Sequence, residues 1–355
     1  MDLVTALARA RSAEEPGPDT PAGPAVPPWP GPPLLVPDAG PGDLDLDRLL
    51  RLSLLASDRS GRLRPAASAG ALHPVDARLV VGARCPLPPG RYGYDPLRHR
   101  VHRLGPQPHG TPPGATVELT VTPRRTRSHY GHRAWPLLLL DTGHAAGALW
   151  LAAEALGAGP AVLRLDGRTE TPLAAVHLPP PTGSPVPGTA PPPRRSAPPP
   201  LRGTPPRDDL RALLGTAVGA SAGELAWCAA VGPPDPGLLE AAPDGTLRRL
   251  AAGEARPTLA VWAARQAWLA EAGAVLLGRG CPVGADAARI RRTHLRAGFA
   301  VQLAQVAAVR RGLAARPVGS WQQADLGAAL GAPPGRDLVV HGLALGTTTD
   351  EERTS

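Results

Sequence analysis

The chain has 355 residues, enough for two domains with a sizeable core. All 38 basic residues are arginine, because the sequence contains no lysine, and this excludes chemistry that needs a lysine base or Schiff base. The net charge of +8 suits an anionic partner, but only 3% of the residues are aromatic. Because no basic recognition helix or RNA-binding signature accompanies that charge, we expect no nucleic-acid binding.

Cysteine usage and hydropathy indicate the compartment. The three cysteines are odd in number and far apart, so they support neither a disulfide framework nor a CxxC metal site. His129 and His132 are three residues apart but have no third ligand nearby. No signal peptide is evident, and no run of 18 apolar residues occurs. We therefore expect a cytoplasmic protein with no metal site and no membrane span.

The first half begins with a Pro- and Gly-rich segment over residues 1–43, of which 14–43 is expected to form neither ladders nor helices. Leucines at helical spacing and β-branched alternation predict the elements that follow. These are a helix over 44–55, strands over 78–81 and 116–121, and a helix over 137–156 that Gly157 ends.

The second half follows a Pro-rich linker over 179–207, which contains Pro-Pro-Pro three times around Arg194-Arg195. Here the predicted elements are helices over 258–267 and 295–310 and strands over 274–277 and 338–340. The tail over 347–355 is short and polar. Helices mixed with a few strands in each half predict the α+β class.

The chain also repeats itself. The string Ala67-Ser68-Ala69-Gly70 recurs as Ala220-Ser221-Ala222-Gly223, and the helix from Gly143 to Gly157 recurs from Gly298 to Gly312, both intervals being fourteen residues. The matches keep their order and lie about one domain length apart. We therefore predict two copies of one domain, over 44–178 and 208–346, with the small-residue turn of the second copy degenerate.

Four motifs in the first copy carry a family resemblance. They are the turn over 65–74 (PAASAGALHP), the two-tyrosine hairpin over 89–96, the His-Tyr cluster over 129–133, and the helix over 139–157. Their order resembles the SagB-type azoline dehydrogenases of the nitroreductase superfamily. The resemblance implies a central sheet among helices, bound FMN, and oxidation of azoline rings to thiazoles or oxazoles in a ribosomally made peptide.

The resemblance also implies one composite flavin site, because the copies keep different parts of it. Copy one keeps the turn but lacks room between 104 and 124 for a family helix, whereas copy two keeps that helix around 254–268 and the closing loop over 315–319. The implied FMN-binding residues are Arg62, Arg64, Ser68, Ala69, Gly70, Ala71, Leu72 and His73 from copy one and Gln266, Arg316 and Gly319 from copy two. The arginines substitute for an Arg-Arg-Ser-x-Arg string that the chain lacks.

The implied catalytic residues are His129 and Tyr130. The family's Lys-Tyr pair is credited with proton removal, and His129 stands at the lysine position. An imidazole, with an ordinary pKa of about 6.5, is a competent base at neutral pH.

The resemblance implies a peptide substrate and a cyclodehydratase as partners. The two copies would form a pseudo-dimer within one chain, and a further homodimer stays open. Two other functions also stay open: a non-catalytic scaffold or partner protein in peptide biosynthesis, and an NAD(P)H-dependent flavin reductase of nitro, quinone or dehydroamino-acid substrates.

Overall fold

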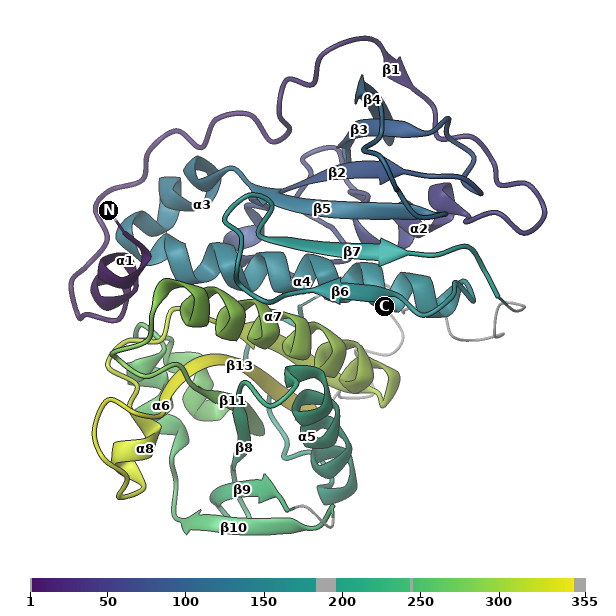
Figure 1. Cartoon of the computed structure of the whole chain (residues 1–355). Helices are drawn as coiled ribbons and strands as arrows, with labels where there is room; N and C mark the ends of the chain where they lie inside the picture. The colour runs from purple at the N-terminus through teal and green to yellow at the C-terminus, as the bar shows by residue number, and fades with distance from the viewer. Residues whose placement is uncertain (1, 183–195, 243–244, 348–355) are drawn as a thin grey trace.

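The computed structural model describes residues 2–182, 196–242 and 245–347. In these residues two antiparallel sheets form the outer layers, and two long helices lie between them (Figure 1). Helix α4 (Ala134–Ala155) covers the sheet of the first half, and α7 (Ala287–Arg310) covers the sheet of the second half. The two helices pack directly on each other, so the halves share one continuous interior.

The two sheets have the same topology. The spatial order is β1-β4-β3-β2-β5-β7-β6 in the first and β10-β9-β8-β11-β13-β12 in the second, so each strand except β1 has a counterpart in the same place. In both copies the long helix follows the corresponding strand, β5 or β11. The strands of the first sheet are β1 (Pro33–Leu34), β2 (Val75–Val81), β3 (Gly90–Asp95), β4 (Arg100–Gly105), β5 (Ala115–Val121), β6 (Val162–Arg164) and β7 (Ala174–Leu178). Those of the second are β8 (Ala226–Val231), β9 (Gly237–Ala241), β10 (Leu247–Ala252), β11 (Ala274–Gly280), β12 (Leu313–Val318) and β13 (Leu338–Thr347). The predicted α+β fold in two copies is confirmed.

The remaining helices are shorter than α4 and α7 and lie around the sheets. They are α1 (Leu3–Ala10), α2 (Leu46–Ser53), α3 (Pro123–Tyr130), α5 (Arg207–Ser221), α6 (Arg256–Trp262), α8 (Leu326–Ala329) and the 3-10 helices η1 (Ala69–Ala71), η2 (Gly131–Arg133) and η3 (Ala267–Glu271). All four predicted strands and the helices over 44–55, 137–156 and 295–310 are confirmed, with ends that differ by a few residues. None of the helices in the described residues is long and apolar enough to cross a membrane.

One helix was missed and two predictions about local structure were wrong. Helix α1 was not predicted; it is capped by the carboxylate of Asp2 and buries Leu7. The segment over 14–43 does form a short ladder, because β1 pairs with β4 at the open edge of the sheet. The helix predicted over 258–267 ends at Trp262, since Ala264 and Arg265 adopt positive φ angles of 55° and 59° that a helix cannot contain.

The linker is only partly described, and Arg194-Arg195 lies outside the described residues. Its described end, 196–206, packs against copy two instead of standing free. Leu201 is buried and accepts a hydrogen bond from the Gly273 amide at 2.7 Å, and the Ala197 amide donates to the Ala315 carbonyl at 3.1 Å. The polar tail beyond Thr347 is likewise outside the described residues.

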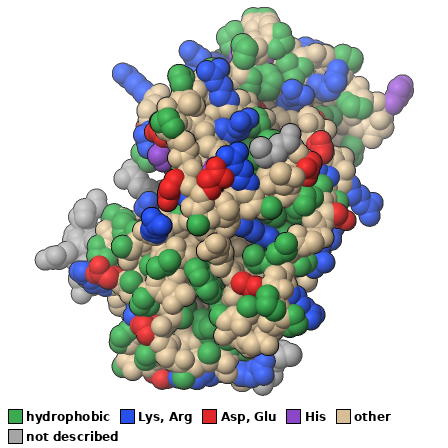
Figure 2. Space-filling view, turned by 90° about the vertical axis from the view of Figure 1, so that its left-hand side faces the viewer, with side chains coloured by type: hydrophobic (Ala, Val, Ile, Leu, Met, Phe, Trp, Pro, Cys, Tyr) green, Lys and Arg blue, Asp and Glu red, His purple; other side chains and the backbone are tan. Residues whose placement is uncertain are grey.

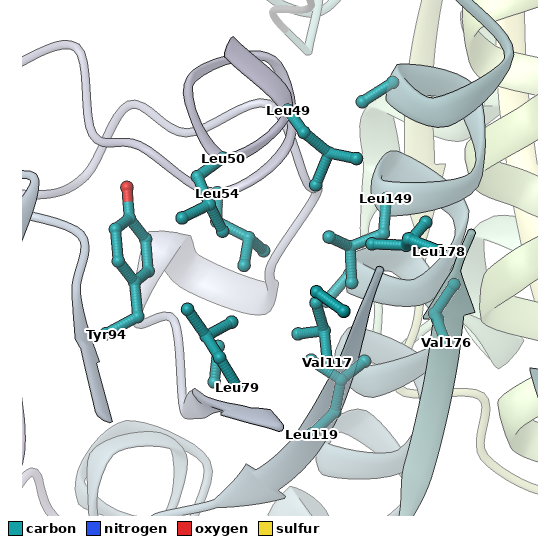
Figure 3. Packing of buried hydrophobic residues seen from close by; sticks show 14 of the residues in the cluster. Leu49, Leu50, Leu54, Leu79, Tyr94, Val117, Leu119, Leu149, Val176 and Leu178 are labelled. Carbon is teal, nitrogen blue, oxygen red and sulfur yellow. The ribbon is translucent and has the colours of Figure 1, made fainter. Parts of the chain in front are cut away.

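The core of the first half lies between its sheet and two helices. Leucines 49, 50 and 54 around α2 point toward strand residues such as Leu79 and Val117 and toward Leu149 on α4 (Figure 3). The inward face of each strand alternates with an outward face, which is why the strand pattern could be seen in the sequence. On the face that carries α1 and α3, acidic side chains lie among the arginines across the middle, so the net charge does not gather there (Figure 2).

Helices α4 and α7 cross at two glycines. A Cβ added at Gly143 would lie 2.8 Å from the amide nitrogen of Phe299 and 3.0 Å from the Cα of Gly298. A Cβ added at Gly298 would in turn lie 3.0 Å from the Cα of Leu140. These are the two repeat glycines, so the repeat in the sequence marks the place where the backbones of the copies touch.

We expect Gly143→Ala to destabilise the protein by about 1–3 kcal/mol or more, because the methyl group forces the helices apart in a packed interior. Gly215→Ala in α5 is the matched control, since that glycine is also helical but has nothing within 4 Å of its added Cβ. This control should be neutral or stabilising, because alanine favours a helix by about 1 kcal/mol over glycine. Urea unfolding of both variants measures the difference, and equal stabilities would contradict the close crossing.

Candidate functional site

The small-residue turn adopts a backbone that few residues tolerate. Gly70, Ala71 and His73 have positive φ angles of 60°, 53° and 43°. An internal hydrogen bond stabilises the turn, because the Ser68 hydroxyl accepts from the His73 amide at 2.9 Å. The His73 ring is bonded to the carbonyl of Arg62 at 2.9 Å, so this histidine holds the turn from the side.

Asp141 fixes the turn to helix α4. One of its carboxylate oxygens accepts from the Ser68 hydroxyl at 2.6 Å, and the other accepts from the Ala69 amide at 3.1 Å. The side chain is buried, and burial raises the pKa of this carboxyl to about 7. Sequence reasoning did not single out Asp141, although the residue stands in the string Leu140-Asp141-Thr142-Gly143-His144 that carries the family resemblance.

Two adjoining cavities lie on either side of this turn. Their volumes are about 870 and 460 Å³, and the described residues that line both are Ser68, Gly70, Ser196 and Arg316. Both copies contribute, since the first cavity also includes Gln302 and Val306 from α7 and the second includes Gly319. Ten of the eleven predicted cofactor residues line one cavity or the other. The exception is Leu72, whose amide closes the η1 turn on the Ala69 carbonyl.

The first cavity, of about 870 Å³, is lined by four arginines and by no acidic side chain among its described residues. Arg64 is partly buried, and this burial lowers its pKa to about 10, so it stays charged at neutral pH. Arg316 donates to the Ala197 carbonyl at 3.2 Å and lies over the ring of Trp268. The others are Arg62 and Arg51. Arg51 was not predicted, and its spacing on α2 gave no sign that it would reach the turn.

The His-Tyr pair lies at the rim of the second cavity, which has a volume of about 460 Å³. The hydroxyl of Tyr130 is close to the turn, since a Cβ added at Gly70 would lie 3.3 Å from it. The His129 side chain is 55% exposed and packs edge-on against the Tyr130 ring at 4.8 Å between centroids. Its Nδ1 lies 3.1 Å from both carboxylate oxygens of Asp19.

The N-terminal segment forms the outer wall of the second cavity through Pro16, Gly17 and Asp19. It is held along α3, where the Thr20 amide donates to the Ser128 carbonyl at 2.8 Å. Its composition is typical of an extended surface segment, so the sequence gave no reason to place it in a site. The structure therefore adds Asp19 to the candidate site residues.

The remaining copy-two residues close the same cavity. Gln266 donates to the carbonyls of Ala263 at 2.8 Å and Gly319 at 3.4 Å, which joins the end of α6 to the loop after β12. Two arginines elsewhere in the chain make structural contacts: Arg125 pairs with Asp76 at 2.7 Å, and Arg291 donates to the Gly167 carbonyl at 2.6 Å. Neither of them lines the first or the second cavity.

A comparison with solved structures identifies the fold. A nitroreductase-type protein from Anabaena variabilis superposes with a TM-score of 0.68 over 86% of this chain and 88% of that chain, at 19% sequence identity. That superposition extends over both sheets. The chain has a nitroreductase fold, in two tandem copies. The nitroreductase-like fold predicted from the sequence is thus confirmed.

Other nitroreductase-fold structures match a smaller share of the chain. A protein from Desulfovibrio desulfuricans in complex with FMN matches 44% of this chain and 83% of its own, with 20% identity and a TM-score of 0.31. A chain of the Escherichia coli microcin synthetase McbBCD complex with truncated pro-MccB17 bound matches 38% of this chain and 62% of its own, with 20% identity and a TM-score of 0.31. No family model and no curated protein matches the sequence.

The two copies differ at the position of the small-residue turn. The repeat offset places Arg296 and Phe299 on α7 where α4 carries Asp141 and His144. Ser221, the counterpart of Ser68, ends helix α5, and its hydroxyl accepts from the Trp227 indole at 2.6 Å. Copy two also turns here, at Ala222 and Gly223, but its serine hydroxyl is engaged by a buried indole and no carboxylate stands at the position of Asp141.

The same offset aligns Gly147 of copy one with Gln302 of copy two. A Cβ at Gly147 would lie 2.9 Å from the Gln302 side chain, so the glycine makes room for it. Gln302 then bonds the turn of copy one, accepting from the Ala67 amide at 3.2 Å and donating to the Pro65 carbonyl at 3.1 Å.

Proposed function

We propose that the protein is an FMN-dependent oxidoreductase with one composite site per chain. The observation that carries the proposal is the pair of adjoining cavities at the junction of the copies, of which the first is lined by four arginines. Their volumes of about 870 and 460 Å³ lie in the range of cofactor sites, roughly 300–1,000 Å³. In this proposal the two copies span residues 44–178 and 208–346, as predicted from the sequence.

The donor set fits FMN. Arginine guanidinium groups suit a phosphate, and Arg62, Arg64 and Arg316 would hold it at the first cavity. In the second cavity two buried polar atoms, Arg133 Nε and Ser320 Oγ, have no hydrogen-bond partner among the described residues. Buried polar atoms are normally paired, so a polar ligand in this cavity is a natural partner.

Bound FMN would supply the hydride acceptor that an oxidation requires. The chain itself supplies the base, because Asp19 holds the Nδ1–H of His129 and leaves the lone pair on Nε2. In that state His129 can take a proton from a substrate at the rim of the cavity. Tyr130 lies between this ring and the turn, and we assign it the orientation of the substrate.

The substrate we propose is an azoline ring in a ribosomally made peptide, which loses a proton and a hydride to become a thiazole or an oxazole. Its support is the order of the four sequence motifs, and a cyclodehydratase is the partner that would form the azoline. The His129 side chain is 55% exposed, which suits a substrate as large as a peptide.

The visible absorption spectrum of the purified protein tests the cofactor, followed by titration with FMN. We expect a bound flavin spectrum and about one FMN per chain at saturation. Incubation with an azoline-containing peptide should then bleach the flavin in the absence of oxygen. A protein that takes up no FMN would favour the scaffold function, and one that takes up FMN but reacts only with NAD(P)H and a nitro compound or quinone would favour a reductase.

A further inference from the structure

A chain of buried hydrogen bonds joins the two copies at the floor of the second cavity. It begins at the Val318 carbonyl, which lies 3.0 Å from Nδ1 of His341. The Nε2 atoms of His341 and His144 are 2.9 Å apart. The Nδ1 of His144 in turn lies 3.2 Å from Oε1 of Gln302. Both histidines are almost fully buried and both line the cavity.

The orientation of the Gln302 amide is fixed by the turn. Its Oε1 faces the Ala67 N–H at 3.2 Å, and its Nε2 faces the Pro65 carbonyl at 3.1 Å. If the two amide atoms were exchanged, the Nε2 donor would face the N–H donor of Ala67, and the Oε1 acceptor would face the carbonyl acceptor of Pro65. Oε1, a pure acceptor, is therefore the atom that faces His144.

The state of His341 follows from its own partner. A carbonyl can only accept, so Nδ1 of His341 carries a hydrogen toward Val318. Burial lowers the pKa of His341 to about 4, so this ring is neutral and its Nε2 carries a lone pair. The bond between the two rings is then donated by Nε2–H of His144.

His144 thus faces an acceptor at each ring nitrogen. A neutral imidazole has one N–H, and with that hydrogen on Nε2 the lone pair of Nδ1 would oppose the oxygen of Gln302. We propose that His144 is a buried imidazolium that donates from both nitrogens and so couples the cofactor turn of copy one to the closing loop of copy two. His144 is in this view a positioning residue, and the inference does not depend on the proposed function.

The surrounding charges favour this assignment. Asp141 lies one turn earlier on α4, where residues three apart are neighbours, and lines the same cavity, so the ionised form of its carboxyl favours an imidazolium. Burial raises the pKa of that carboxyl to about 7. On α7, burial lowers the pKa of His294 to about 3, so that ring adds no charge. The other titratable side chains that line the cavity are Asp19, His129, Tyr130, Arg133 and Arg316.

The sign of the pH dependence follows. A histidine whose folded pKa is raised contributes its coupling below the ordinary pKa of about 6.5, and the coupling is lost as the pH rises through the folded pKa. Below that pH the hydrogen bond from His144 to Gln302 holds the small-residue turn. Above it this hydrogen bond is replaced by a repulsion between the lone pairs of His144 Nδ1 and Gln302 Oε1.

Nitrogen NMR of the full chain, labelled at histidine and free of cofactor, tests the proposal. At about pH 7 we expect one buried histidine with both ring nitrogens protonated, and its signals should disappear in His144→Gln. The amide signal of Ala67 should shift with the same titration. The exposed His109 serves as the internal reference. A wild-type His144 that shows one unprotonated ring nitrogen at this pH would overturn the proposal.

Two substitutions of the acceptor separate the proton from simple packing. Gln302→Leu removes the oxygen, so the proton affinity of His144 should fall by roughly tenfold or more, as expected for a hydrogen bond to a charged group. Gln302→Glu keeps an acceptor and should keep His144 doubly protonated. Equal titration of both variants would contradict the assigned role of Gln302, and if neither variant folds the wild-type spectrum alone decides.

Discussion

His129→Ala should lower the rate of azoline oxidation by roughly a hundredfold to ten-thousandfold, the contribution typical of a general base. The side chain lies at the rim of the second cavity and is half exposed, so its removal leaves no hole in the core. FMN content and the free energy of unfolding should therefore stay at their wild-type values. Single-turnover bleaching of the flavin by the azoline peptide measures the rate.

The matched control is His109→Ala, since His109 is also exposed but does not line either cavity. Asp19→Asn is a second test variant, because it weakens the hydrogen bond to Nδ1 of His129 and leaves the imidazole in place. It should lower the rate less than His129→Ala does. Unchanged turnover in the His129 variant, at full flavin content, would remove this residue from the mechanism and shift attention to Asp141.

The sequence allowed the fold to be predicted because its main signals are local. Alternation on the strands and the apolar stretch before Gly157 depend on residues that are neighbours in the chain, and the repeat glycines mark the helix crossing. Helix α1 escaped notice because its eight residues present only one strongly buried leucine, Leu7. Helix α6 ends before two residues with positive φ angles, Ala264 and Arg265. Because neither is a glycine, nothing in the sequence marks this end.

The candidate site was predictable only where a motif named its residues. The turn and the arginines before it could be placed near each other, since they are adjacent in the chain. The contacts of Asp19 with His129 and of Gln302 with Ala67 join residues separated by 110 and 235 positions, and neither has a local pattern. Such pairs depend on how the copies pack, which composition and periodicity do not specify.

Replacing arginines of the first cavity should weaken FMN binding and leave riboflavin binding unchanged, because riboflavin lacks the phosphate. Arg64→Gln removes a partly buried cation that FMN would cover, and loss of one partner from a buried charge pair costs at least roughly 2 kcal/mol, about 30-fold in the dissociation constant. Arg316→Gln should act in the same direction although it belongs to copy two. The pair of substitutions therefore tests both the phosphate site and its composite origin.

The control for this experiment is Arg98→Gln, whose side chain is 76% exposed and lines neither cavity. Arg98→Gln lowers the net charge of the protein by the same amount as Arg64→Gln and Arg316→Gln do. It therefore separates a local contact with the phosphate from the general attraction of a basic protein for an anion. The ratio of FMN to riboflavin affinity should fall in the Arg64 and Arg316 variants and stay constant in the control. If riboflavin binding fell in parallel with FMN, the arginines would be holding the turn instead of the phosphate. If only Arg64→Gln weakened FMN, copy two would wall the cavity without contributing to the phosphate site.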